Sequence, residues 1–247
     1  MNNLPLFMVQ MQFDARKIMI QASESGLLKT DVDEGYYIHQ QILEMFGKNV
    51  FSTFCITGQK AGWINVLAYS NQSAKDLQEL AEEYSTPLRY SSCNWETFSS
   101  KPMPKNWPTG KKYHFEVKTC PVVRVGNSSG KFKKGAEVDA FLIALNLESS
   151  LKQSREQVYK KWGLEQFTRS AAAKVESIRL EGFKRIKFLR RTQGENRTAK
   201  ILERPEACLK GELLIQDGEK FTGFITKGIG RHSSFGFGML LLKPIAK

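Results

Sequence analysis

A glycine-rich stretch near the carboxy terminus constrains the fold of this chain more than any other feature. Residues 228–238 read GIGRHSSFGFG and lead directly into the apolar run of residues 239–242. Glycine allows backbone conformations that other residues avoid, and it lets the chain lie against a ligand without an intervening side chain. A dinucleotide-binding site would need a helix after the loop and an acidic residue about 20 positions further on, but only nine residues follow Gly238. The pattern therefore argues against a Rossmann site. It favours a loop that contacts a polynucleotide backbone, with a bulge or tight packing before a strand as the alternative.

Positive charge is concentrated in the second half of the sequence. The formal net charge is +12 and the pI is about 9.5. Residues 1–125 carry 13 Lys and Arg against 12 Asp and Glu, whereas residues 126–247 carry 24 against 13. Polyanions, and nucleic acid first among them, are therefore the expected partners of the second half.

The densest basic segment spans residues 169–200, where ten Lys and Arg stand against only three Glu. Its latter part reads as a strand, a turn and a returning strand. A basic hairpin of this kind can follow the groove of a duplex RNA and contact phosphates on both sides. The alternative is a charged edge strand that protects a sheet against aggregation. The scarcity of acidic residues favours binding.

Several classes of protein are disfavoured by what the sequence lacks. The four cysteines show no paired spacing, which argues against a zinc site or a disulfide framework and fits a reducing cytosol. The amino terminus lacks the pattern of a signal peptide, and no apolar run approaches the roughly 20 residues that span a bilayer, so we expect a cytoplasmic protein. Metal-ligand spacing, a P-loop and a nucleophile elbow are also missing, which disfavours a metal-dependent nuclease, an NTPase and a serine hydrolase.

Hydrophobic periodicity predicts an alternation of strands and helices. In residues 6–13 every second residue lies on one wholly apolar face, as in a half-buried strand. Asp33 is placed to cap a helix over residues 34–46, which Gly47 ends. The apolar stripe predicted to be buried in this helix is Ile38, Ile42, Met45 and Phe46. The other predicted strands are residues 50–56, 63–69, 112–117, 173–180, 186–191, 207–215 and 238–242, and the other predicted helices are residues 73–84, 137–147, 155–167 and 220–227.

This order of elements predicts an α+β fold with two domains. The elements up to residue 117 follow the βαββαβ order of ferredoxin-like domains, in which two helices cover one face of a four-stranded antiparallel sheet. Residues 124–135 are rich in Gly, Ser and Lys and mark the expected boundary. The prediction is two tandem ferredoxin-like domains, residues 1–125 and residues 126–247, with the glycine-rich loop between the last helix and the last strand.

The carboxy-terminal segment resembles a known family. An aliphatic strand at residues 213–215, a short helix over residues 221–227 and the sequence GIGRHSSFGFGMLLL are similar to the signature of the CRISPR repeat-processing endoribonucleases, and among them to the CasE/Cse3 family of type I-E effector complexes. The resemblance extends weakly over most of the chain. It includes a Pro-containing loop before residue 112 and a helix with a histidine three residues after a tyrosine, which here are His39 and Tyr36.

The resemblance implies a site and a chemistry. It places the catalytic histidine at His39, with Tyr36 one turn away to orient a hydroxyl or donate to a phosphate. The ribose 2′-hydroxyl would attack the adjacent phosphate and yield a 2′,3′-cyclic phosphate, a reaction that needs no metal or other cofactor. A histidine with a pKa of about 6.5 can serve as base or as acid, and the sequence leaves that choice open. On the residues alone, a single histidine on a helix is more often packed than catalytic.

The resemblance also implies partners. They are the CRISPR precursor RNA, the mature guide RNA that would stay bound after cleavage, and other subunits of the type I-E surveillance complex. The predicted RNA-binding residues lie in the basic hairpin and the glycine-rich loop: Lys184, Arg185, Lys187, Arg190, Arg191, Arg197, Lys200, Gly228, Gly230, Arg231, Ser233, Ser234, Gly236 and Gly238. His232 is a further candidate for phosphate contact, and His114 is expected to be structural or exposed.

Two interpretations from other classes remain. A non-catalytic RNA-binding subunit of a ribonucleoprotein effector complex would use the same loop and hairpin, although the sequence lacks the aromatic-glycine strand motif by which many such modules stack bases. A structural effector subunit of similar fold would bind guide RNA without cutting it.

Overall fold

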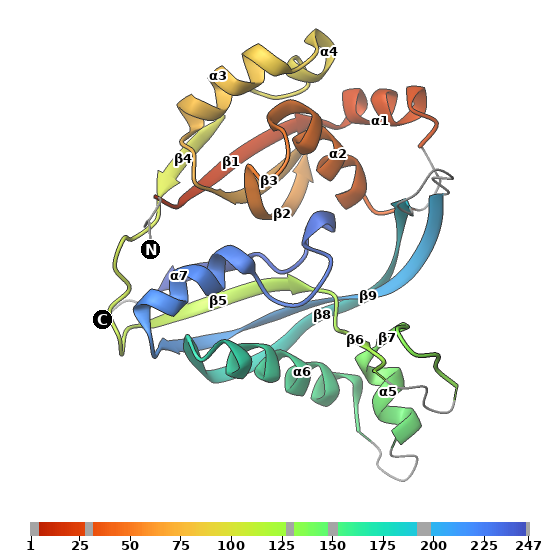
Figure 1. Ribbon diagram of the computed structural model, residues 1–247, viewed down its shortest axis with the longest axis vertical. Coiled ribbons are helices and arrows are strands. Elements are labelled where there is room, and N and C mark those ends of the chain that lie inside the picture. The colour runs from red at the N-terminus through yellow and green to blue at the C-terminus, as the bar shows by residue number, and fades with distance from the viewer. Residues whose placement is uncertain (1–4, 28–31, 127–130, 148–152, 192–198, 246–247) are drawn as a thin grey trace. The chain divides into compact units, whose positions relative to one another are not determined.

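A computed structural model describes residues 5–27, 32–126, 131–147, 153–191 and 199–245 (Figure 1). The chain divides into two compact units, each assembled from three separate segments. The first unit holds Met1–Lys105, Lys187–Leu202 and Ser233–Met239, and the second unit holds Asn106–Ile186, Glu203–His232 and Leu240–Lys247. Two segments from the second half of the sequence therefore belong to the first unit.

The first unit is built on a four-stranded antiparallel sheet. Its strands are β1 (Phe7–Asp14), β2 (Phe51–Lys60), β3 (Trp63–Ser70) and β4 (Ser99–Pro102), in the order β2-β3-β1-β4. β1 pairs with β3 along its whole length and with β4 at its beginning. The predicted alternation of β1 is confirmed, because Val9, Met11 and Phe13 are fully buried.

Helices pack on the buried face of this sheet. They are α1 (Ala15–Glu24), α2 (Gly35–Phe46), α3 (Ala74–Tyr84) and the short α4 (Pro87–Tyr90). α1 begins at Asp14, whose carboxylate accepts hydrogen bonds from the backbone N–H groups of Arg16 and Lys17 and so satisfies donors that have no partner within the helix. α2 ends where predicted, at Gly47 with φ +84°.

The core of the first unit lies between these helices and the sheet. From α2 it takes the predicted stripe of Ile38, Ile42, Met45 and Phe46, which packs with the apolar faces of β1 and β3. Leu189, from the second half of the sequence, is 1% exposed and belongs to the same cluster. The helix that carries His39 is therefore packed into the core along one side.

The second unit repeats the plan. Its sheet contains β5 (Lys112–Thr119), β8 (Ala173–Arg191), β9 (Ala199–Ile215) and β10 (Leu240–Pro244), in the order β10-β5-β9-β8. β5 pairs with β9 from Lys112 opposite Leu214 to Thr119 opposite Ala207. Its other edge pairs with β10.

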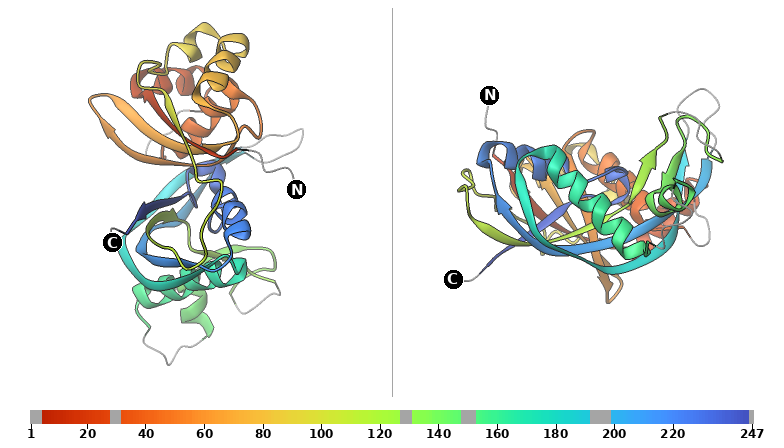
Figure 2. Two further views of the ribbon diagram at one scale, coloured as in Figure 1. Left: turned by 90° about the vertical axis from the view of Figure 1, so that its left-hand side faces the viewer. Right: turned by 90° about the horizontal axis from the view of Figure 1, so that it is seen from below.

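Two helices, α6 (Arg155–Ser170) and α7 (Gly218–Lys227), pack on one face of the second sheet. The ring of Phe167 in α6 lies 5.0 Å from Phe115 of β5 and 5.3 Å from Phe224 of α7, measured between ring centroids. Figure 2 shows α6 lying along β8 and β9. Between β5 and α6 the chain inserts a two-stranded sheet of β6 (Val122–Arg124) and β7 (Glu137–Asp139), followed by α5 (Ala140–Leu147).

Both sheets have the same strand order, which is fourth-first-third-second within each βαββαβ unit. The prediction of two ferredoxin-like folds is therefore confirmed. The placement of residues 112–117 as the last strand of the first domain is wrong, since β5 is the first strand of the second sheet. The last strand of the first sheet is β4, within the Pro-containing segment, and the units part between Lys105 and Asn106 rather than at residues 125 and 126.

Other differences from the prediction have local causes. α1 lies between the first predicted strand and the helix that follows Asp33, where no helix was predicted. Residues 137–139 form β7 because Val138 is buried and paired with β6, and the helix starts only after Asp139, whose carboxylate accepts from Phe141 N. The two strands predicted at 173–180 and 186–191 are the single strand β8, and the last strand begins at Leu240 rather than at residue 238.

The four cysteines are free thiols, as predicted; Cys55, Cys93 and Cys120 are buried and Cys208 is partly exposed. Within the described ranges, no helix combines the length and the apolar character needed to cross a membrane.

Gly211 provides a test of the packing of the second sheet. A Cβ at Gly211 would lie 1.9 Å from the backbone oxygen of Ser177, so Gly211→Ala forces two backbones apart. We expect it to lower the free energy of unfolding by about 1–3 kcal/mol. The matched control is Gly182→Ala on β8, where an added methyl meets nothing within 4 Å and the change should stay below about 0.5 kcal/mol. Urea denaturation followed by circular dichroism measures both, and equal stabilities for the two variants would contradict the close approach.

Candidate active site

His39 lies on α2 and lines a small open pocket of about 70 Å³. The walls of the pocket come from α2, from the start of β2 and from the 3-10 helix η1 (Ser233–Phe235) within the glycine-rich loop. Its other polar lining residues are Asn49, Ser52, Thr53, Ser233 and Ser234. Three of the predicted site residues, His39, Ser233 and Ser234, thus lie together in the first unit.

The imidazole of His39 is partly buried. Burial lowers its pKa below the ordinary value of 6.5, because removal from water disfavours the charged form. The neutral ring therefore predominates at neutral pH, and a neutral imidazole can accept a proton from a neighbouring hydroxyl.

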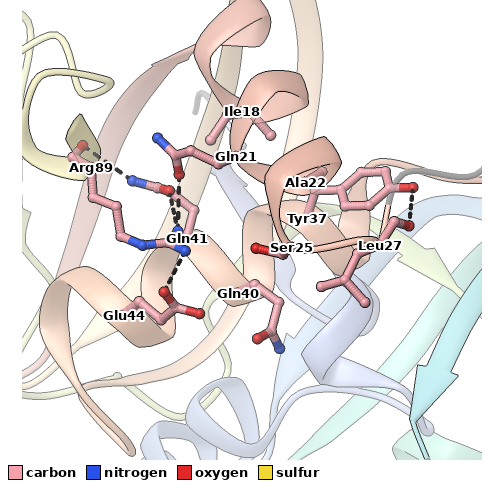
Figure 3. Close-up of a pocket in the computed structure, with 10 residues that line it drawn as sticks. All are labelled: Ile18, Gln21, Ala22, Ser25, Leu27, Tyr37, Gln40, Gln41, Glu44 and Arg89. Carbon is pink, nitrogen blue, oxygen red and sulfur yellow. Dashed lines mark hydrogen bonds and ion pairs between the residues drawn. The ribbon is translucent and has the colours of Figure 1, made fainter. Parts of the chain in front are cut away.

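The side of α2 that faces away from His39 is fixed by a polar network (Figure 3). Arg89 of α4 donates hydrogen bonds to the side-chain oxygens of Gln21 (2.9 Å) and Gln41 (3.0 Å), and it forms an ion pair with Glu44. Gln41 and Glu44 point well over 90° around the helix from His39, at about 100° per residue. The network joins α1, α2 and α4, so it fixes the rotation of α2 and with it the direction of His39.

η1 packs closely against the first turn of α2. A Cβ on Gly35 would lie 2.2 Å from the backbone oxygen of Phe235, so this approach requires glycine. The ring of Phe235 stacks on Tyr36 with a centroid distance of 6.3 Å and an interplanar angle of 25°. Just after η1, Gly236 has φ +82°, and a Cβ there would lie 3.2 Å from the ring of Phe54 in β2. These contacts hold Ser233 and Ser234 at the pocket.

Tyr36, the second predicted catalytic residue, does not line the pocket. Its side chain is 5% exposed and belongs to the core. Besides stacking on Phe235, its ring meets Tyr37 edge-on at 6.0 Å. This burial favours a packing role that supports η1, and catalysis by the Tyr36 hydroxyl stays a prediction.

The two residues before η1 contact a carboxylate. Arg231 Nε donates to Glu137 Oε1 at 2.7 Å, and His232 Nε2 lies 3.1 Å from Glu137 Oε2. The His232 side chain is 8% exposed and does not line the His39 pocket. The predicted phosphate contacts of Arg231 and His232 stay predictions.

The glycines of the loop have conformational reasons within the fold. All four predicted positions have positive φ: +73° at Gly228, +81° at Gly230, +82° at Gly236 and +86° at Gly238. Gly228 ends α7, and a Cβ on Gly230 would lie 2.8 Å from the ring of Trp162. Turning and close packing therefore explain the glycines without a ligand, and contact with an RNA backbone stays a prediction.

The basic hairpin is formed by β8 and β9. Lys184, Arg185 and Lys187 are exposed on β8. Lys184 forms an ion pair with Glu206 at 3.2 Å, and Arg185 forms one with Glu203 at 3.0 Å, so carboxylates of β9 partly balance these cations. Arg190, Arg191 and Lys200 lie in the strands with side chains outside the description, and Arg197 lies outside the described residues.

The far end of the hairpin belongs to the first unit and contacts the segment before α2. Asp33 N donates to the backbone oxygen of Lys187 at 2.7 Å. The Asp33 carboxylate accepts from Gly35 N at 2.9 Å, which supports its predicted capping role, although the N-cap position itself is Glu34. The hairpin and the His39 helix are therefore linked through the backbone and through the buried Leu189.

Sequence reasoning missed Phe235, Glu137 and the lining residues Asn49, Ser52 and Thr53. Phe235 stands in the glycine-rich stretch, Ser52 and Thr53 in a predicted strand and Glu137 at the start of a predicted helix. No pattern in these segments marked the residues themselves as parts of a site. His114 is half exposed and lies 3.5 Å from Glu212, as expected for a surface histidine. Among the described residues, no group of three or more His, Cys, Asp or Glu is placed to hold a metal ion.

The family model for CRISPR associated protein matches residues 6–244 of the chain. No curated protein sequence gives a significant match. Among solved structures, the chain is similar to CRISPR endoribonuclease Cse3 bound to a 19-nucleotide RNA, with a TM-score of 0.63, 15% identity and coverage of 97% of this chain and 100% of that one. Cas6e from Escherichia coli K-12 matches with a TM-score of 0.51, 17% identity and the same coverage. A chain of a CRISPR RNA-guided surveillance complex matches with a TM-score of 0.58, 14% identity and the same coverage.

At these identities the structural likenesses establish the fold, and they agree with the two ferredoxin-like units described above. The family match covers almost the whole chain, including the glycine-rich loop and the helix that carries His39. The protein therefore belongs to the CRISPR associated protein family, as its carboxy-terminal segment suggested.

Proposed function

We propose that this protein is an endoribonuclease that cleaves CRISPR precursor RNA at its repeat stem-loops without a metal ion. The observation that carries the proposal is the meeting of His39 with Ser233 and Ser234 in one pocket, in a chain of the CRISPR associated protein family. The similarity to an endoribonuclease bound to RNA supports it.

The reaction would use the RNA's own nucleophile. The 2′-hydroxyl loses its proton, its oxygen bonds to the adjacent phosphorus, and the bond from phosphorus to the 5′ oxygen breaks. The products are a 2′,3′-cyclic phosphate and a 5′-hydroxyl that has gained a proton. His39, which is neutral at neutral pH because burial lowers its pKa, is suited to take the 2′ proton as the general base.

The serine hydroxyls at the pocket would act on the phosphate. Ser233 and Ser234 line the same pocket as His39, and each hydroxyl can donate one hydrogen bond. Donors that are held in place before the reaction stabilise negative charge as it develops on phosphate oxygens. The packing of η1 on α2 supplies that rigidity.

The basic hairpin would hold the repeat stem, and the protein would remain on its product. Phosphate contacts along a stem survive the loss of one phosphodiester bond, so release of the mature guide RNA would be slow. The likeness to a chain of a CRISPR RNA-guided surveillance complex supports a lasting place in such an assembly. If the protein is instead a non-catalytic RNA-binding subunit, it would bind RNA through the same surfaces, and His39 would take no part in a reaction.

Replacement of His39 separates the two functions. We expect His39→Ala to abolish cleavage of repeat RNA in excess chelator while RNA affinity stays within about threefold, because the variant removes a general base, worth about 10²–10⁴-fold in rate, and no phosphate contact. His114→Ala, on the half-exposed histidine of the second unit, is the control and should cleave normally. Single-turnover cleavage and filter binding measure both effects. Full cleavage by His39→Ala would remove the site assignment, and no cleavage by the wild-type protein would favour the non-catalytic subunit.

The role of His39 as a base has a pH signature. A base acts in its neutral form, and the pKa of His39 is lowered, so kcat/KM should rise with pH and level off below pH 6.5. The profile of kcat/KM reports the free enzyme, which is the state described here. A kcat/KM that falls with rising pH across this range would instead assign His39 as the acid.

Binding of RNA by the hairpin can be tested at Lys187, which is exposed on β8. Lys187→Ala should weaken binding of repeat RNA and reduce the slope of log affinity against log salt by about one, because one phosphate contact and its released counterion are lost. Lys75→Ala, on the exposed surface of α3, is the control for a lysine outside the hairpin. Identical salt slopes for the two variants would show that Lys187 does not contact an RNA phosphate.

A further inference from the structure

Phe183 is an aromatic side chain at the surface of the second unit, next to two cations. It lies on β8 and is 39% exposed. Lys184 and Arg185, which follow it, are exposed as well. On its other side, a Cβ added at Gly182 would meet no atom of the described chain within 4 Å. This part of β8 is therefore open to a ligand, and covering the ring would remove apolar surface from water.

The ring of Phe183 packs against a cation and a second ring inside the protein. The guanidinium carbon of Arg155, on α6, lies 4.4 Å from the centroid of Phe183 and 4.2 Å from the centroid of Phe141 on α5. These distances are those of cation–π interactions. The ring of Tyr159 lies 5.7 Å from that of Phe183, at an angle of 60°. The exposed surface of Phe183 is therefore the part of the ring that these partners leave uncovered.

Arg155, which supports the ring, is itself held in place. One of its Nη atoms donates hydrogen bonds to Asp139 Oδ2 at 2.7 Å and to the hydroxyl of Tyr159 at 2.6 Å. The Tyr159 hydroxyl donates in turn to Asp139 Oδ1 at 2.9 Å, and the Tyr159 side chain is fully buried. This closed network fixes the guanidinium and with it the ring of Phe183. A ring that is fixed before binding has little side-chain freedom left to lose when a ligand stacks on it.

Arg185 is the cation on the same face of the sheet as Phe183. Side chains two residues apart in a strand point to the same face. The ion pairs agree with this alternation, because Arg185 pairs with Glu203 and Lys184 with Glu206, and residues three apart in β9 lie on opposite faces. Arg185 and Glu203 are 66% and 45% exposed. Such an exposed pair contributes little, so a phosphate can take the place of this carboxylate.

We infer that Phe183 is a stacking site for one unpaired base of the RNA, with Arg185 contacting a phosphate beside that base. Stacking on an aromatic side chain next to a cation is a common way to hold single-stranded nucleotides, because every base has a π face and a phosphate nearby. A base inside a paired stem has no free face, so the ligand is a nucleotide that flanks the stem or lies in its loop. The inference rests on the proposed function in taking repeat RNA as the ligand, and it adds recognition of an unpaired base.

Substitutions of Phe183 test the stacking. We expect Phe183→Leu to weaken binding of repeat RNA about 5- to 150-fold, as loss of one stacked base does, with an unchanged slope of log affinity against log salt, because stacking releases no counterion. Phe183→Tyr keeps the ring and should bind within about twofold of the wild type. Arg185→Ala should instead reduce the salt slope by about one. Tyr84→Leu, on an exposed aromatic of α3, is the control and should bind like the wild type. Filter binding over a salt series measures all four.

Repeat RNAs that lack a single base identify the ligand. In such a series, each unpaired nucleotide in turn is made abasic. At one position, loss of the base should weaken wild-type binding about as much as Phe183→Leu does, and it should cost Phe183→Leu little more, because partners in contact are not additive. A damaged fold would instead give additive losses at every position. That result would overturn the stacking, and so would equal affinities of Phe183→Leu and the wild type.

The same measurements separate this inference from the proposed cleavage. If the wild-type protein binds repeat RNA without cutting it, the proposed cleavage fails, and the abasic series still decides whether Phe183 stacks on a base. If the wild-type protein cuts repeat RNA and Phe183→Leu binds as tightly as the wild type, the stacking site alone is wrong. If the wild-type protein does not bind repeat RNA, both are wrong.

Discussion

The close approach of η1 to the first turn of α2 is the contact on which the candidate site depends. It is possible because Gly35 has no side chain where the carbonyl of Phe235 passes, and the stacking of Phe235 on Tyr36 stabilises it. Without this contact, His39 would stand on a core helix with no polar group of the glycine-rich loop nearby. The same loop is restrained again after η1, where Gly236 passes against Phe54. Gly35 and Gly236, which are distant in sequence, thus allow the loop around η1 to pack directly against α2 and β2.

Fewer cationic side chains are available to RNA than the composition of the second half suggests, because some of them are paired with carboxylates. Lys184 and Arg185 are paired with glutamates of β9, and Arg231 is paired with Glu137. Exposed ion pairs contribute little, with a median of about 0–1 kcal/mol, so a phosphate can displace Glu203 from Arg185, where both side chains are exposed. The gain from this exchange is smaller than from an unpaired cation, since an existing attraction is lost. Lys184 and Arg231 differ, because their carboxylate partners, Glu206 and Glu137, are enclosed and a phosphate would leave each of them buried without a full set of partners. This pairing therefore favours a structural role over phosphate contact for both residues.

Local pattern was enough to find much of the fold. The alternation of β1, the apolar stripe of α2 and the glycine at its end are properties of neighbouring residues, and each was predicted correctly. The assignment of β5 failed because its partners, β9 and β10, are far away in sequence, and no local pattern encodes which sheet a strand joins. β4 was missed because a four-residue strand reading SSKP has no apolar alternation.

For the candidate site, the family resemblance pointed to His39. The structure showed that Ser233 and Ser234 line the same pocket. The burial of Tyr36 depends on Phe235, a contact that spacing within α2 does not reveal.

The division of the chain explains why a single boundary in the sequence was a poor description. The first unit takes Leu189 and η1 from the second half, and both fill places that residues 1–105 leave open: Leu189 in the core and Phe235 against Tyr36. The pocket itself combines His39 with serines from beyond residue 230. A site made in this way exists only after both halves of the chain have folded, because its two sides are contributed by segments with no local contact in sequence. Its assembly therefore depends on contacts between residues far apart in sequence, such as Gly35 with Phe235.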